Sequence, residues 1–174
     1  MSKFFKNNYH ILTYVFLYSS LIIAFYLDEN VAGGAKYDLQ YTLKQVAIFN
    51  ENFLDSFFNY DKIEHPNRLS PIYITLLLVF KKIFFSLEIA RFVLLHILIL
   101  SQLYFYKCLK IVYQNKFSLD KKVLFFLSCI IFISPSFRSN IIWVESSMFG
   151  LLFFMIGLYY FLKNLKKVNI KNIY

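Results

Sequence analysis

The apolar residues of this chain are gathered into long, uninterrupted blocks. A half-buried helix or strand of a soluble protein would instead place its apolar residues 3.6 or two positions apart. Crossing a hydrocarbon core about 30 Å thick takes roughly 20 apolar residues in a helix. We therefore predict an all-α membrane protein with four transmembrane helices, at about 9–27, 89–110, 121–134 and 146–162.

The composition favours the same class, because 59% of the 174 residues are hydrophobic, whereas soluble domains are close to one half apolar. Cys108 and Cys129 form no CxxC pair and have no metal-ligand spacing, so we expect two inert, packed thiols. A net charge of +9 would suggest a nucleic-acid partner in a soluble protein. Here no basic run lies within a soluble recognition fold, and we expect no nucleic-acid binding.

A fifth apolar stretch, 71–87, is interrupted by Lys81 and Lys82 after ten uncharged residues. That length suits a re-entrant or interfacial segment better than a span. The distribution of charge separates these alternatives, because cytoplasmic loops of membrane proteins carry an excess of Lys and Arg. With four spans and a cytoplasmic N-terminus, the inner pieces hold 11 cations and one acid, and the outer pieces hold eight cations and nine acids. We predict a re-entrant segment at 71–87 and both termini in the cytoplasm.

The first span follows Lys3 and Lys6, as the apolar region of a secretory signal would. Its apolar region is longer than that of a signal peptide, however, and no A-x-A-like cleavage site follows it. We interpret it as a signal anchor and the whole chain, 1–174, as a single transmembrane domain.

The outer segment between the first two spans, 28–88, is too long to be a simple connector. Apolar residues recur at helical spacing through 39–58, with polar residues between them. This pattern predicts an amphipathic helix on the outer membrane surface. Ile48 and Phe49 interrupt the polar face, so one helix or two short ones fit equally well.

Three groups of polar residues lie in the predicted outer loops. The first contains Asp28, Glu29 and Asp38, with the pair Gly33–Gly34 between them. The residues alone favour a solvated loop in which the glycines make a turn and Asp38 is the N-cap of the following helix. A carboxylate site at the mouth of the first span is the alternative.

The second group is a corner at His65–Pro66, where prolines five residues apart forbid a continuous helix. The third is the loop that carries Arg138, Trp143 and Glu145. Arg138 would suit a phospholipid headgroup, and Trp143 would suit an interfacial aromatic belt. Glu145 is harder to explain in this way, since an ionisable group near the start of a span usually faces protein or water.

Polar and small residues within the spans have simpler interpretations. We expect His96 and Gln102 to hydrogen-bond to neighbouring helices. Gly150 and Gly157 lie on one face of the fourth span and predict close helix packing there.

The order of these features resembles the N-terminal part of the GT-C glycosyltransferases, and in particular the protein mannosyltransferase and lipid A aminoarabinose transferase families. His65–Pro66 with Pro71–Ile72–Tyr73 is similar to the HPPL or PPLYY corner of that family, and 86–91 (SLEIAR) to its SEFAAR segment. The run 134–138 (SPSFR), followed by Trp143 and Glu145, resembles its second outer loop.

The resemblance implies transfer of a sugar from a polyprenyl-phosphate carrier to a lipid, polysaccharide or protein acceptor at the outer face of the membrane. The family's catalytic carboxylate lies in the first outer loop, and the match falls on the pair Asp28–Glu29, as in the family's DE motif, or on Asp38. We favour Asp38, because it follows the Gly33–Gly34 turn at the start of the amphipathic helix. It implies that Arg138 holds the carrier phosphate and that Glu145 is a second acidic group. A divalent metal ion is compatible with this set of residues but is not required by it.

Members of that family have about twice as many spans, whereas this chain ends at Tyr174, after the fourth. We therefore expect a truncated or split module, with a second polypeptide as a partner that supplies the missing spans. The alternative is a non-catalytic four-span protein, such as a flippase subunit or a partner in polysaccharide assembly. A channel or transporter has little support, because few ionisable residues lie within the spans.

Overall fold

The computed structural model describes residues 3–30, 34–62, 70–117 and 120–171. These ranges are helical and contain no strand. The helices are α1 Lys3–Tyr26, α2 Ala35–Glu51, α3 Phe53–Phe58, α4 Pro71–Phe84, α5 Leu87–Leu98, α6 Leu100–Phe117, α7 Lys121–Cys129, α8 Pro135–Ile142 and α9 Ser146–Lys171, with short 3-10 segments at Tyr60–Lys62 and Ile130–Ile133. The predicted corner at His65 and Pro66 lies outside the described residues.

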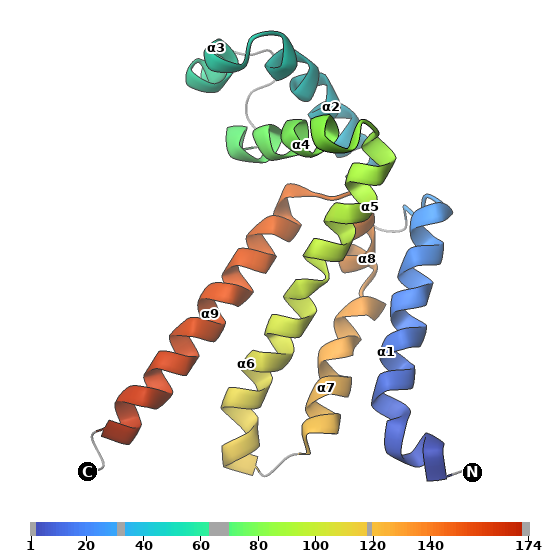
Figure 1. The fold of residues 1–174 in the computed structure, drawn as a ribbon, viewed down its shortest axis with the longest axis vertical. Coiled ribbons are helices and arrows are strands. Elements are labelled where there is room, and N and C mark those ends of the chain that lie inside the picture. The colour runs from blue at the N-terminus through green and yellow to red at the C-terminus, as the bar shows by residue number, and fades with distance from the viewer. Residues whose placement is uncertain (1–2, 31–33, 63–69, 118–119, 172–174) are drawn as a thin grey trace.

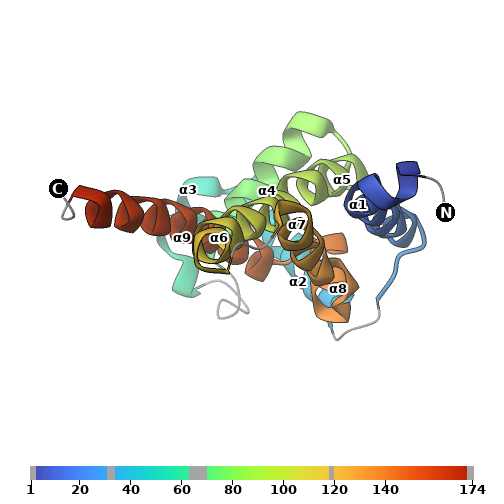
Figure 2. The same ribbon diagram turned by 90° about the horizontal axis from the view of Figure 1, so that it is seen from below.

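The long helices form a row, and the short helices cover one end of it (Figure 1). Helix α6 packs against both α9 and α7, and α7 packs against α1. Seen from below, the order across the molecule is α9, α6, α7 and α1 (Figure 2). Both ends of the chain lie at the end of the row opposite α2, α3 and α4 (Figure 1).

Three helical stretches are long and apolar enough to cross a membrane: Asn8–Tyr26, Leu87–Tyr113 and Ser146–Lys166. A fourth crossing would combine Lys121–Ile133 with Pro135–Ile142, which are bent by 71° relative to one another. The bend follows from Pro135, which occupies the first turn of α8, and from Ser134, whose hydroxyl accepts the N–H of Phe137 at 3.4 Å. The chain is thus an all-helical membrane protein with three or four candidate spans.

The stretch predicted as re-entrant forms α4, one uninterrupted helix that lies across the end of the row (Figure 1). Ser70 caps it by accepting the N–H of Ile72, and Pro71 occupies its first turn. It ends at Phe85, which has a φ of 55°. Lys81 and Lys82 lie in its last turn, where cations interact favourably with the helix dipole.

The predicted amphipathic region is two helices, α2 and α3, which meet at Asn52. Leu39, Val46 and Phe49 of α2 are buried in the core of the protein, and α2 packs against α4. The apolar face of α2 therefore contacts protein rather than lipid. Phe58 in α3 is 77% exposed, so α3 has the more exposed apolar surface.

The expectations for polar and small residues within the spans are met in part. The Gln102 amide donates to the Ser128 hydroxyl of α7 at 2.7 Å, which confirms a contact between helices. His96 instead pairs with the Phe92 carbonyl of its own helix at 2.6 Å. The prediction of close helix packing at Gly150 and Gly157 is wrong for the described residues. A Cβ added at either position would meet nothing within 4 Å.

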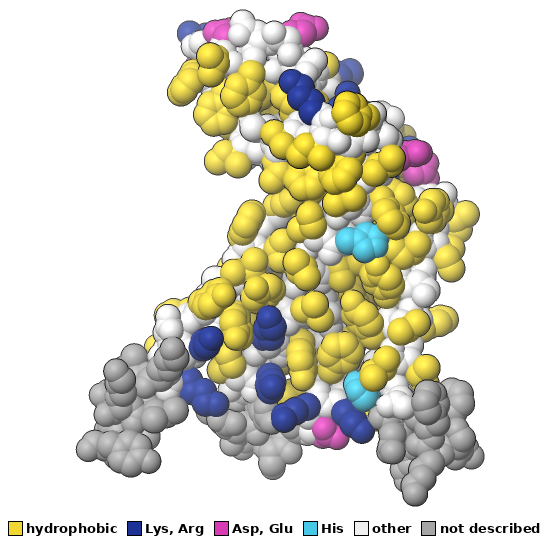
Figure 3. Space-filling model, in the orientation of Figure 1, with side chains coloured by type: hydrophobic (Ala, Val, Ile, Leu, Met, Phe, Trp, Pro, Cys, Tyr) yellow, Lys and Arg dark blue, Asp and Glu magenta, His cyan; other side chains and the backbone are white. Residues whose placement is uncertain are grey.

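Charge differs between the two ends of the row (Figure 3). At the end that holds the termini, the described side chains include six lysines and one acid: Lys107, Lys110, Lys121, Lys122, Lys163, Lys166 and Asp120. Most acidic side chains lie at the opposite end, with α2, α3 and α4 (Figure 3). Lysine-rich ends of membrane proteins usually face the cytoplasm.

Candidate functional site

The predicted outer-loop carboxylates and Arg138 lie at the end of the row that α2 and α4 cover. The turn after α1 places two of them. Asp28 has a φ of 52°, a left-handed conformation that Asp tolerates better than most residues. The Asp28 N–H donates to the Phe25 carbonyl at 3.2 Å, and the Glu29 N–H donates to the Ala24 carbonyl at 2.9 Å. This turn ends α1 and directs the Asp28 carboxylate toward α5 and the Glu29 carboxylate toward α8.

Glu29 and Arg138 form a bidentate ion pair. Arg138 donates from Nε to Glu29 Oε1 at 2.8 Å and from Nη2 to Glu29 Oε2 at 2.7 Å. A third donor, Nη1, reaches the Ser20 hydroxyl at 3.0 Å. Hydrogen bonding to Arg138 lowers the pKa of Glu29. In this arrangement Arg138 is bound to an internal carboxylate, so binding a phosphate would require the pair to open.

A second arginine, Arg91 of α5, is 7% exposed. Its guanidinium lies between two rings, 5.0 Å from the Phe25 centroid and 4.2 Å from the Trp143 centroid. Its Nη2 donates to the Ile142 carbonyl at 3.1 Å and is 4.0 Å from Asp28 Oδ1. From the sequence, Arg91 is expected as one of the outer cations and as the last residue of the 86–91 segment, with no role in the site. A cation within an apolar span was the signal that could have identified it.

Trp143 contacts several segments of this region. It is 4% exposed, so it is a buried residue and not a member of an interfacial belt. Its indole N–H donates to the Glu29 carbonyl at 2.8 Å. The Lys36 ammonium of α2 lies 5.1 Å from the ring centroid. Trp143 therefore contacts residues from the loop after α1, from α2 and from α5.

The carboxyl groups of Asp38 and Glu145 are hydrogen-bonded to each other. Asp38 is the fourth residue of α2, and Gly34 is the N-cap, so Asp38 does not cap the helix. Val144, with a φ of 55°, precedes Glu145, whose N–H donates to the Asn140 carbonyl at 2.8 Å. Burial and the contact with Asp38 raise the pKa of Glu145. Burial and this contact therefore favour the protonated form of Glu145.

Tyr73 of α4 completes this corner. Its hydroxyl donates to the Val144 carbonyl, directly beside Glu145. Burial, with a contribution from the Glu145 charge, raises the pKa of the Tyr73 hydroxyl. Ser147 also donates to Glu145 Oε2, at 3.2 Å. Ser147 is therefore a hydroxyl donor to Glu145, whereas the Tyr73 hydroxyl is engaged by the Val144 carbonyl.

A cavity of about 250 Å³ opens on the side of the same region, between α1 and α5. Its lining combines apolar and charged side chains: Phe25, Tyr26, Asp28, Glu88, Ile89, Arg91 and Phe92. Among the described residues, no group of three or more His, Cys, Asp or Glu side chains is arranged to hold a metal ion. The site can thus offer carboxyl groups for proton transfer and a buried guanidinium for an anion.

The structure brings together Asp28, Glu29, Asp38, Arg138 and Glu145 at one end of the molecule, in three separate contacts. Comparison with protein-family models, with curated proteins and with solved structures found no match.

Proposed function

We propose that this chain is a membrane glycosyltransferase of the GT-C type, or the N-terminal part of one. In this proposal the end covered by α2 and α4 is the outer face of a bacterial inner membrane, and both termini are cytoplasmic. The donor is a sugar on a polyprenyl-phosphate carrier, and the acceptor is a hydroxyl of a lipid, polysaccharide or protein.

The observation that carries the proposal is the contact between Asp38 and Glu145. The contact places Glu145, a carboxyl group whose pKa is raised, beside a second carboxyl group, Asp38. A carboxylate at this place can accept the proton of an acceptor hydroxyl as that hydroxyl attacks an anomeric carbon. Asp38 is also the carboxylate favoured from its position in the sequence, after the Gly33–Gly34 turn.

The reaction proceeds in one displacement. The acceptor oxygen forms a bond to the anomeric carbon while the bond from that carbon to the carrier phosphate breaks. The acceptor proton passes to the Asp38–Glu145 pair, and polyprenyl phosphate leaves as an anion. A guanidinium matches the geometry of that phosphate, and Arg91 on the wall of the cavity is a second candidate beside Arg138.

The test is transfer of labelled sugar from a polyprenyl-phosphate donor in membranes that contain the chain. We expect Asp38→Asn and Glu145→Gln each to lower the rate by about 100-fold, since both remove the proton acceptor. Glu51→Gln is the matched control, because Glu51 is an exposed acid of the same helix α2. Identical, nonzero rates for the wild type, Asp38→Asn and Asp28→Asn would disprove the catalytic assignment.

A non-catalytic role in polysaccharide assembly is the second candidate. It is favoured by the Glu29–Arg138 pair, which leaves the predicted phosphate ligand bound to an internal carboxylate. It predicts no sugar transfer by the wild type, together with a larger membrane partner that is retained equally well by Asp38→Asn and by Glu51→Gln.

A further inference from the structure

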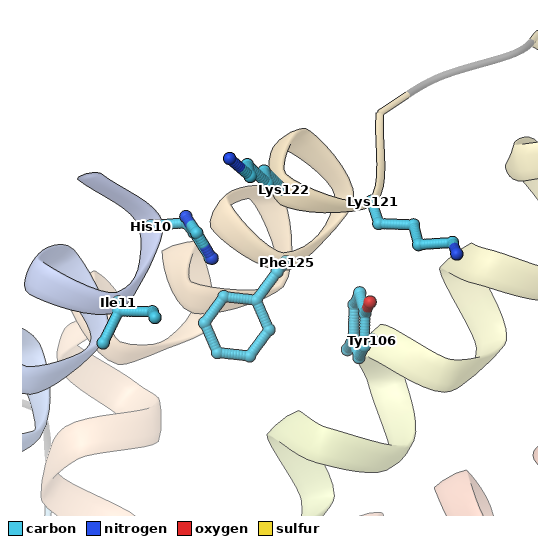
Figure 4. Close-up of a pocket in the computed structure, with 6 residues that line it drawn as sticks. All are labelled: His10, Ile11, Tyr106, Lys121, Lys122 and Phe125. Atoms are coloured by element: carbon cyan, nitrogen blue, oxygen red, sulfur yellow. The ribbon is translucent and has the colours of Figure 1, made fainter. Parts of the chain in front are cut away.

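A second pocket lies at the lysine-rich end of the row, away from the carboxyl pair (Figure 4). Its volume is about 260 Å³, and it opens between α1, α6 and α7. Six residues line it: His10, Ile11, Tyr106, Lys121, Lys122 and Phe125. No step of the proposed transfer reaction uses this pocket.

The wall of the pocket is mostly aromatic and aliphatic. The Phe125 ring stands in the middle, with the His10 ring 6.0 Å and the Tyr106 ring 5.3 Å from it between centroids. Ile11 is 50% exposed and extends the apolar wall along α1. A surface of this kind suits the glycerol and first acyl carbons of a lipid.

The rim of the pocket is cationic. Lys121 and Lys122 begin α7 and leave it on opposite sides, Lys122 on the side of His10 and Lys121 on the side of Tyr106 (Figure 4). The nearby acid, Asp120, is engaged as the cap of α7, because its carboxylate accepts the Lys122 backbone N–H at 3.0 Å. Two lysines and one acid thus lie at this opening among the described residues, and their formal charges sum to a positive value.

The His10 ring belongs to the wall of the pocket and lies beside the Lys122 side chain (Figure 4). Its Nδ1 atom is buried and has no hydrogen-bond partner among the described residues. Because protein encloses that atom, the ring contributes mainly a flat surface to the wall.

We propose that this pocket binds the phosphate headgroup of an anionic phospholipid from the leaflet at the lysine-rich end. Lys121 and Lys122 supply the positive charge that attracts the phosphate, the His10 ring lies beside it, and Ile11 and Phe125 contact the glycerol and upper acyl chain. Basic pockets between membrane helices are suited to anionic headgroups. The inference does not depend on the proposed transferase activity.

The experiment measures lipid binding by the purified full chain in a neutral detergent, with native mass spectrometry. Phosphatidylglycerol is expected to remain bound, whereas phosphatidylcholine is not. Lys121→Gln/Lys122→Gln should weaken phosphatidylglycerol binding by about tenfold. Lys163→Gln/Lys166→Gln is the matched control, because it removes two exposed lysines from the same end and leaves the pocket intact. His10→Leu, which keeps a side chain of similar bulk, should give a smaller loss.

Several results would overturn the proposal. If Lys121→Gln/Lys122→Gln and Lys163→Gln/Lys166→Gln weakened phosphatidylglycerol binding equally, the lipid would be attracted by the overall positive charge of this end and not bound in the pocket. Equal retention of the two lipids would remove the role of the anionic headgroup. Competition by soluble glycerol phosphate at the same concentration would show that a free phosphate, and not a lipid, is the ligand. Thermal unfolding in the absence of lipid checks that each variant is folded. If Lys121→Gln/Lys122→Gln does not fold, the single variant Lys121→Gln takes its place.

Discussion

Arg138 holds Glu29 by two parallel hydrogen bonds, although the two residues come from opposite ends of the chain. The pair fixes the loop after α1 against α8. The Arg138 side chain is 17% exposed and the Glu29 side chain 21%, so water screens the pair only in part. It is therefore both a structural tie and a barrier to any anion that would bind Arg138.

Removing one partner of this pair should destabilise the protein. Glu29→Gln leaves the Arg138 charge without its carboxylate, and we expect a loss of about 1–3 kcal/mol in the free energy of unfolding. Thermal or denaturant unfolding in detergent measures it, with Glu51→Gln as the control for loss of an exposed acid. The double variant Glu29→Gln/Arg138→Gln should be less unstable than the sum of the single variants. Simple additivity would mean that the pair contributes nothing as a pair.

Stability should depend on pH in opposite directions at Glu145 and Glu29. The pKa of Glu145 is raised in the folded chain, so its contribution is complete below the unfolded value of about 4.3 and is lost as pH rises through the folded value. The pKa of Glu29 is lowered, so its contribution is present above that unfolded value and is lost as pH falls through the folded value.

Glu145→Gln separates the two effects, because a neutral amide imitates the protonated acid at every pH. In melting curves recorded from about pH 4 to about pH 8, the decline of the wild type on the alkaline side should shrink in this variant. The decline on the acid side should remain. An alkaline decline of unchanged size would assign it to a group other than Glu145.

Trp143 is the one tryptophan of the chain and therefore a specific probe of the site. The Trp143 ring is buried and contacts Lys36 of α2 and Arg91 of α5. Brominated lipids should therefore quench its fluorescence only weakly. Strong quenching, as expected of an interfacial tryptophan, would contradict the described position. Arg91→Met should change the emission while Lys81→Met, at an exposed lysine of α4, should not.

The orientation of the chain can be tested with reporters. A reporter inserted at Asn115, near the end of α6, should map to the cytoplasm, and one at Asp61 should map to the outer side. The reverse result at Asn115 would refute the proposed topology and, with it, the proposed outer-face transferase.

The spans could be predicted from the sequence because lipid imposes a length and a composition that are visible residue by residue. The break of the 39–58 region into two helices was left open, since Ile48 and Phe49 fit either arrangement. The burial of Trp143 and the pairing of Glu29 with Arg138 could not be predicted, because they join segments far apart in the chain. Asp38 was identified as a candidate, yet its contact with Glu145 joins α2 to a loop more than 100 residues later, which no local pattern encodes.

The row of long helices has a mechanical consequence. Helix α9 is the outermost member on one side and packs mainly on α6, so it has one principal neighbour to hold it. A pulling force applied at the C-terminus would therefore separate α9 from α6 first. The contacts of α6 with α7 and of α7 with α1 would bear the force only afterwards. Extraction from that end should proceed in steps, one helix or helix pair at a time.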